Sequence, residues 1–197
     1  IRPELRLEGK NEPNDTFKSK MLLISLLDLE DEVFEVYERE GSKDLIFHDI
    51  RYLKNITTQA ELIGRAEMLE DDELLHLRLA SIFVKSGYIN EYKSYEAESL
   101  RILRKKAPEY AFSDRQINAA ASIISDALSS DPRLRTGQVL SDAINDYMGR
   151  VDYIIRLELL FSEQKAMGAV DDKKAWFKSQ TERMSGFNYI TSTAKLL

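Results

Sequence analysis

Apolar residues recur at intervals of three and four along most of the chain, and this spacing limits the fold more than any other feature. The first such segment is expected to form a helix over 16–40. Its apolar face would carry Leu22, Leu26, Leu29, Val33 and Val36. No Asn-Gly or Asp-Gly hairpin turn and no sustained alternation of apolar and polar residues indicates a strand. The sequence therefore predicts an all-α protein, folded as a compact multi-helix bundle.

Further helices are expected, separated by glycine, proline and capping residues. They cover about 48–69, 70–86, 92–106, 113–128, 137–148, 150–164 and 171–184, and a short final helix ends at Leu197. The acidic residues 70–73 favour a helix N-terminus, since a calcium loop would need a different ligand spacing. Ser113 and Gln116 have the spacing of a capping box. Residues 1–15 are interpreted as an N-terminal arm, and 16–197 as a single domain.

Composition excludes several kinds of chemistry. The 197 residues include no cysteine and two histidines, so disulfides, cysteine-ligated metals and thiol nucleophiles are ruled out. The lack of cysteine favours a reducing, cytoplasmic setting. A net charge of −6 disfavours nucleic-acid binding, and the basic run at 101–106 fits a solvated helix face better than a phosphate-binding patch. No apolar run approaches the ~20 residues that a membrane-spanning helix needs, so we expect no membrane partner.

Motifs that carry chemistry are also missing. The chain has no glycine-rich phosphate loop, no HExxH zinc motif and no GxSxG nucleophile motif. Carboxylate pairs such as Asp28 with Glu32 and Glu158 with Glu163 are expected to face solvent, as is usual in an acidic helical protein. The residues alone therefore point to no catalytic site.

Four segments nevertheless resemble the motifs of a known family, in the same order along the chain. They read FHDIRY at 47–52, LASIFVKSGY at 79–88, EAES at 96–99 and LSDAINDYMG at 140–149. The aromatic and threonine-containing tail at 187–194 is also similar. The chain thus resembles the HD-domain superfamily, in particular the bacterial predicted metal-dependent HD phosphohydrolases. The resemblance implies a helical HD-like bundle.

The metal site of that family is not conserved in the residues of this chain. The family binds a divalent metal through a His, a His-Asp pair and a distant Asp, and the resemblance maps these positions onto Tyr52, Val84, Lys85 and Asp142. Valine has no donor atom, and a lysine ammonium repels a metal ion. His48 corresponds to an accessory histidine of the motif. Because the metal generates the attacking hydroxide in such enzymes, the expectation is no catalytic residue, no metal and no cofactor.

The roles of the individual residues stay open. Lys85 could form an internal ion pair with Asp142 that replaces the metal, or its side chain could reach solvent. His48 is expected to start a helix or pack at the surface, and the alternative is contact with a ligand. For Tyr52 the two interpretations are ordinary packing and lining of a remnant pocket.

Two functions from different classes follow. The first is a non-catalytic HD-like domain, with signalling as one expected role, that binds a protein partner, a second copy of itself or a small phosphorylated ligand. Lys85 and Arg51 would supply charge for a phosphate, and the other candidate cleft residues are His48, Asp49 and Glu96. The second is a divergent phosphohydrolase acting on a nucleotide or other phosphoester, with Mg²⁺ or Mn²⁺ held by Asp49, Glu96 and Asp142. A structural scaffold without a ligand is the third interpretation.

Overall fold

A computed structural model of the chain describes residues 15–197, without the side chains of residues 15–17 and 19. In this range the chain forms eight α-helices and three short 3₁₀ helices, and no strand. The α-helices are α1 (Asp15–Glu40), α2 (Ile50–Ala66), α3 (Asp71–Phe83), α4 (Tyr95–Lys106), α5 (Asp114–Ala127), α6 (Arg135–Ile144), α7 (Tyr153–Ala166) and α8 (Lys173–Gly186). The 3₁₀ helices are η1 (Ser86–Ile89), η2 (Ala107–Tyr110) and η3 (Asp146–Gly149). The prediction of an all-α bundle is confirmed.

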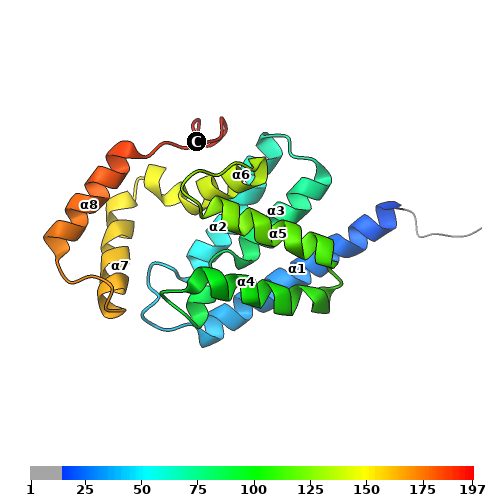
Figure 1. Cartoon of the computed structure of the whole chain (residues 1–197), viewed down its shortest axis with the longest axis horizontal. Helices are drawn as coiled ribbons and strands as arrows, with labels where there is room; N and C mark the ends of the chain where they lie inside the picture. Colours follow the sequence, from blue (N-terminus) through cyan, green and yellow to red (C-terminus); the bar gives the residue numbers. More distant parts are fainter. Residues whose placement is uncertain (1–14) are drawn as a thin grey trace, which may run out of the picture.

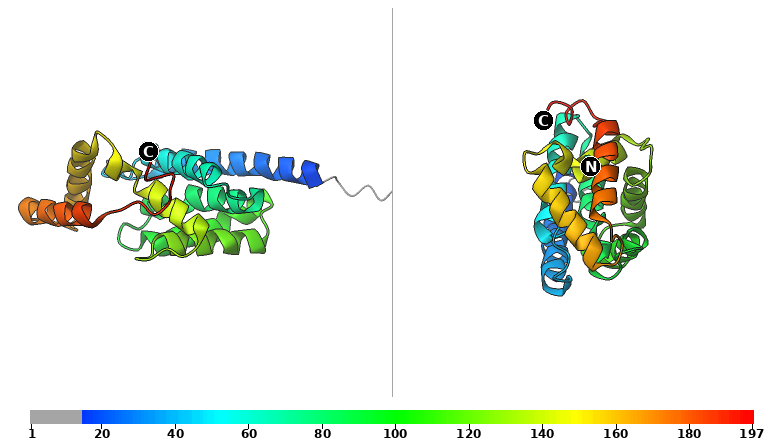
Figure 2. Two further views of the ribbon diagram at one scale, coloured as in Figure 1. Left: turned by 90° about the horizontal axis from the view of Figure 1, so that it is seen from above. Right: turned by 90° about the vertical axis from the view of Figure 1, so that its left-hand side faces the viewer.

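The helices pack in layers. α3 and α6 lie between α2 on one side and α5 on the other, and α1 packs against α2 and α3 (Figure 2). α4 packs against α5, α3 and η1. α7 and α8 form a helical hairpin at one end of the molecule, and the tail at 187–197 returns from α8 toward α2 and α6 (Figure 1). Segments far apart in sequence are thereby brought to the same end of the bundle.

The predicted apolar faces form the core. On α2, the residues spaced by three and four along the chain are all buried: Leu53, Ile56, Ala60 and Ile63. Leu26 and Leu29 of α1 are fully buried in the same apolar cluster. Burying each such aliphatic side chain contributes roughly 1.5–3 kcal/mol, so the periodic faces account for the way the helices pack.

Side-chain capping sets several helix ends. The predicted capping box of Ser113 and Gln116 is present at the start of α5. Glu70 and Glu73 form another at the start of α3, which confirms that the acidic run opens a helix. α2 begins at Ile50 rather than at His48, because the carboxylate of Asp49 caps the helix by accepting from the backbone N–H of Tyr52 (2.9 Å).

The short helix expected at the C-terminus is not formed, and 187–197 consists of turns. The backbone N–H groups of Ile190 and Thr191 bond to a side chain of α6 instead of to helical carbonyls. The N-terminal arm predicted for 1–15 lies outside the described residues except for Asp15, which begins α1. None of the helices between 15 and 197 has the length and apolar character required to cross a membrane.

Candidate functional site

The first two positions that the resemblance maps to metal ligands are occupied by packed side chains. Tyr52, in the first turn of α2, is 5% exposed, and its hydroxyl donates to the carbonyl of Ile144 at 3.0 Å. This bond ties α2 to the end of α6. Val84, directly after α3, is completely buried in the core. Ordinary packing therefore describes both, although Tyr52 also lines a groove described below.

Lys85 is buried, and neither hypothesis for it is correct. Its Nζ donates to the hydroxyl of Tyr95 at 2.8 Å and lies 4.3 Å from the centroid of that ring. It forms no ion pair with Asp142, and with 6% of its surface exposed it does not reach solvent. Burial lowers the pKa of Lys85 to about 7, and the positive charge of Arg183 acts in the same direction.

Asp142 anchors the C-terminal tail, which explains why it does not pair with Lys85. The carboxylate, on α6, is 2% exposed. It accepts from the backbone N–H of Ile190 (2.9 Å) and of Thr191 (2.7 Å), and from the Thr191 hydroxyl (2.7 Å). The one residue of a ligating type at the four positions is therefore engaged with the chain itself.

The side chains do not fit the divalent metal that the resemblance implies. Across residues 15–197 no group of three His, Asp or Glu side chains is placed so that it could hold a metal ion. Asp49 caps α2 and pairs with Arg51 at 2.8 Å. Glu96 is exposed in the first turn of α4.

His48 belongs to a buried network centred on Glu163, a residue of α7. Glu163 is fully buried, which contradicts the expectation that it faces solvent. Its carboxylate accepts from the backbone N–H groups of Phe47 (2.8 Å) and His48 (3.0 Å), from the Tyr92 hydroxyl (2.9 Å) and from Nδ1 of His48. The loop before α2 is thus fastened to the α7–α8 hairpin, and His48 is a buried rather than a surface residue.

The pKa values of His48 and Glu163 are both shifted downward by their surroundings. Burial lowers the pKa of His48, although the hydrogen bond to Glu163 opposes the shift. Burial raises the pKa of Glu163, but the bonds from His48 and Phe47 outweigh this effect and the net pKa is lowered. No sequence motif indicates this role. The spacing of residues nevertheless indicates the buried face of α7, because Glu163 follows the buried Leu160 by three residues and the buried Leu157 by six.

Aromatic rings connect this network to Lys85. His48 stacks on Tyr88 with centroids 4.0 Å apart, and Tyr88 stacks on Tyr95 with centroids 4.2 Å apart. Tyr95 in turn holds the ammonium of Lys85. The four side chains form a continuous column from α4 and η1 to the loop before α2.

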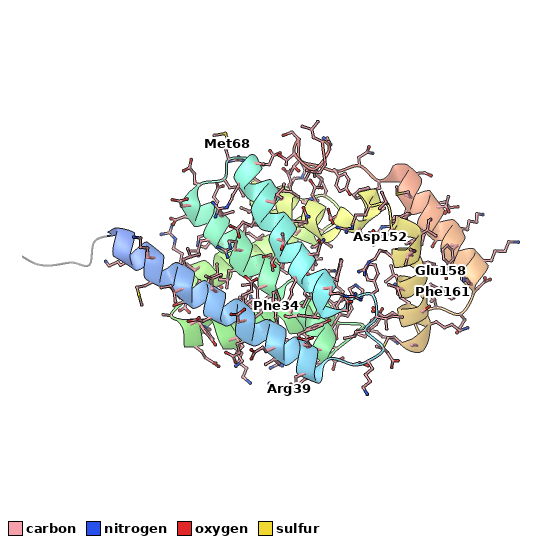
Figure 3. All side chains as sticks on the ribbon, turned by 180° about the vertical axis from the view of Figure 1, so that it is seen from behind. Phe34, Arg39, Met68, Asp152, Glu158 and Phe161 are labelled. Atoms are coloured by element: carbon pink, nitrogen blue, oxygen red, sulfur yellow. The ribbon has the colours of Figure 1, made fainter. Side chains whose placement is uncertain are left out.

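A groove of 420 Å³ opens beside Tyr52, between the start of α2 and the start of α7. Its lining is mostly polar and aromatic: Arg51, Tyr52, Asn55, Tyr147, Arg150, Asp152, Ile155, Arg156 and Leu159. Figure 3 shows Asp152 at the start of α7, with Glu158 and Phe161 further along the same helix. Of the cleft residues predicted from sequence, Arg51 lines this groove, whereas Lys85 lies buried under Tyr95.

The three arginines of the groove differ in their partners. Arg51 pairs with Asp49 at 2.8 Å, and Arg150 lies 3.4 Å from Asp146 and 3.3 Å from Asp152. Arg156 forms no ion pair within the described part of the chain. One of its nitrogens donates to the carbonyl of Phe47 at 3.0 Å, and its guanidinium lies 4.6 Å from the centroid of the Phe47 ring. It therefore retains N–H donors for an anion.

The chain was compared with protein families, curated proteins and solved structures. No protein-family model, curated protein or solved structure matches the chain. The HD-like character accordingly stays a prediction from the order of the four segments.

Proposed function

We propose that this chain is a non-catalytic HD-like domain that binds a small phosphorylated ligand in the groove beside Tyr52. The observation that carries the proposal is the guanidinium of Arg156, which forms no ion pair with a residue in the described range and is flanked by Arg51 and Arg150 on one groove. Arginine is the side chain best suited to a phosphate, because its planar fork donates two parallel hydrogen bonds. Lys85, the cation expected to help Arg51, has no part in the binding.

The proposal includes no hydrolysis because of the residues at the four positions that the resemblance maps to metal ligands. Tyr52, Val84 and Lys85 are packed, and Asp142 holds the tail. The lining of the groove contains no serine, threonine or histidine that could form a nucleophile–base pair. It consists of arginines, tyrosines, aliphatic residues, Asn55 and Asp152. The groove can bind and orient a phosphate ester through its arginines.

The test is binding of a panel of phosphomonoesters, cyclic nucleotides and inorganic phosphate, measured by calorimetry at low salt and followed by analysis of the recovered ligand. We expect saturable binding of at least one phosphomonoester, recovered intact with or without Mn²⁺. Arg156→Met and Arg150→Met should each weaken binding about 10–100-fold, the value of one charge-assisted contact. The matched control is Lys178→Met, which removes an exposed cation on α8 and should leave the affinity unchanged.

Two outcomes would contradict the proposal. One is the lack of saturable binding anywhere in the panel. The other is turnover with Mn²⁺ that is lost in Asp49→Asn or Glu96→Gln, which would support the carboxylate-based phosphohydrolase instead. Measuring ligand recovery in the same samples distinguishes the two.

A further inference from the structure

An apolar stripe runs along the first half of α1 and is not covered by the other residues that the structure describes. Met21, Leu23, Ile24 and Leu27 are 42–52% exposed, although all four are large aliphatic side chains. The N-terminal end of α1 extends past the ends of the neighbouring helices, as the left view of Figure 2 shows. Exposed apolar patches of this kind mark interaction surfaces.

Charged residues flank the stripe in a definite order. With 3.6 residues per turn, Lys20, Asp28 and Asp31 lie within about 60° of Ile24 around the helix axis. All three are exposed, and none forms an ion pair with another residue in the range that the structure describes. The positive charge precedes the apolar centre and the negative charges follow it.

This order is self-complementary when two such helices cross in opposite directions. If Ile24 lies on the two-fold axis, Ile24 faces its own copy and Met21 faces Leu27 of the second copy. The same register places Lys20 opposite Asp28 of the second copy, twice by symmetry. A parallel arrangement would instead place Lys20 against Lys20 and Asp28 against Asp28. Charge complementarity therefore favours a second copy of this chain as the partner, with the two α1 helices antiparallel.

We propose that two copies of this chain associate through this face, with their α1 helices antiparallel and Ile24 at the centre. The contact has a few apolar side chains from each copy, so it belongs to the class of small interfaces below about 1,200 Å² that associate transiently. Both the surface and the occupant are independent of the phosphate-binding groove, which lies at the opposite end of the molecule from the start of α1.

The experiment is sedimentation equilibrium of the 197-residue chain over a wide concentration range at low salt, where exposed ion pairs are least screened. We expect a monomer–dimer equilibrium with a midpoint on the order of tens of micromolar. Ile24→Lys places two like charges on the axis and should raise the midpoint at least tenfold. The matched control is Met184→Lys, which makes the same change on α8, at a side chain 40% exposed, and should not alter it.

Charge exchange tests the register. Lys20→Asp and Asp28→Lys should each weaken self-association, because each creates like charges across the two-fold axis. Mixed together, the two variants should form a heterodimer, since every pair is then of opposite charge, and the double variant K20D/D28K should dimerise like the wild type. All substituted positions are exposed, and circular dichroism of each variant is the check that it folds.

A wild-type chain that stays monomeric at millimolar concentration would overturn the proposal and leave the stripe to another partner. A dimer unaffected by Ile24→Lys would place the interface elsewhere. A double variant as weak as the single ones would rule out the antiparallel register.

Discussion

The ammonium of Lys85 lies on the ring of Tyr95, with Nζ 4.3 Å from the centroid and 2.8 Å from the hydroxyl oxygen. Tyr95 stacks on Tyr88 and Tyr88 stacks on His48. The cation at this position is therefore accommodated by an aromatic face and a hydroxyl, without a carboxylate partner. Such an arrangement favours a lysine that releases its proton near neutral pH.

We expect Lys85 to make the protein more stable as the pH rises from 7 to 9. In the folded chain its pKa is about 7, whereas in the unfolded chain it has the ordinary value of 10.5. The unfolded state therefore binds more protons in this window, and the free energy of unfolding should increase by about 2 kcal/mol across it. Urea denaturation at the two pH values measures the change.

Lys85→Met provides the control for this effect. The variant should lose the rise with pH and should be more stable than the wild type at pH 7 by roughly 1–4 kcal/mol, because a buried charge is replaced by an apolar side chain of similar length. Lys178→Met, at an exposed position, should keep the rise. An unchanged pH profile in Lys85→Met would show that another group titrates.

Asp142→Ala should release the C-terminal tail. The carboxylate accepts three close hydrogen bonds from Ile190 and Thr191, and its removal leaves buried donors without partners. The expected loss is roughly 2–4 kcal/mol in the free energy of unfolding, together with faster proteolysis within 187–197. Thr191→Val removes one of the donors and should cost about 1–2 kcal/mol. If Asp142→Ala is as stable as the wild type, the tail is held by other contacts.

Glu163→Gln should loosen the junction between the loop before α2 and the α7–α8 hairpin. The amide keeps the shape of the side chain but loses the charge that four donors share. We expect a loss of roughly 2–4 kcal/mol and faster hydrogen exchange at the backbone N–H of Phe47 and His48. Tyr92→Phe removes a single donor and should have a smaller effect. Unchanged exchange in Glu163→Gln would contradict the role assigned to the carboxylate.

Gly87→Ala should be strongly destabilising. A Cβ at this position would lie 2.0 Å from the carbonyl oxygen of Tyr95 and 2.7 Å from the backbone nitrogen of Ser99, and neither backbone atom can move without shifting α4. We expect a loss of roughly 1–3 kcal/mol or more, measured by thermal or urea denaturation. Gly186→Ala is the matched control, because nothing lies within 4 Å of its Cβ position. Equal stability of the two variants would show that α4 can move away from η1.

The helices and their buried faces could be predicted because they depend on local spacing. Apolar residues at intervals of three and four placed Leu53, Ile56 and Ile63 correctly, and the capping box at Ser113 fixed the start of α5. The prediction of a final helix was wrong because backbone N–H groups of the tail bond to Asp142, which lies 48 residues before Ile190. Local propensity carries no information about such a partner.

The site was harder to predict because it depends on pairings between distant residues. The resemblance to the HD-domain superfamily predicted that Lys85 and Asp142 lie together. In the structure Lys85 instead bonds to Tyr95, and Asp142 bonds to the C-terminal tail. Glu163 was assigned to the surface because a charged residue usually lies there, and only its donors at 47, 48 and 92 make its burial favourable. Arg51 was identified as a cleft residue, whereas Arg150 and Arg156 belong to a segment that no motif covers.

The bond between Glu163 and the backbone of Phe47 joins residues 116 positions apart. Closing so long a stretch of chain costs more entropy than forming contacts between successive helices, and contacts of this range form late. During refolding, the docking of the α7–α8 hairpin should therefore follow the assembly of the bundle as a separate, slower phase. The single tryptophan, Trp176, packs on Phe161 of the same hairpin, so its fluorescence records the formation of the hairpin, and hydrogen exchange at Phe47 and His48 records its docking.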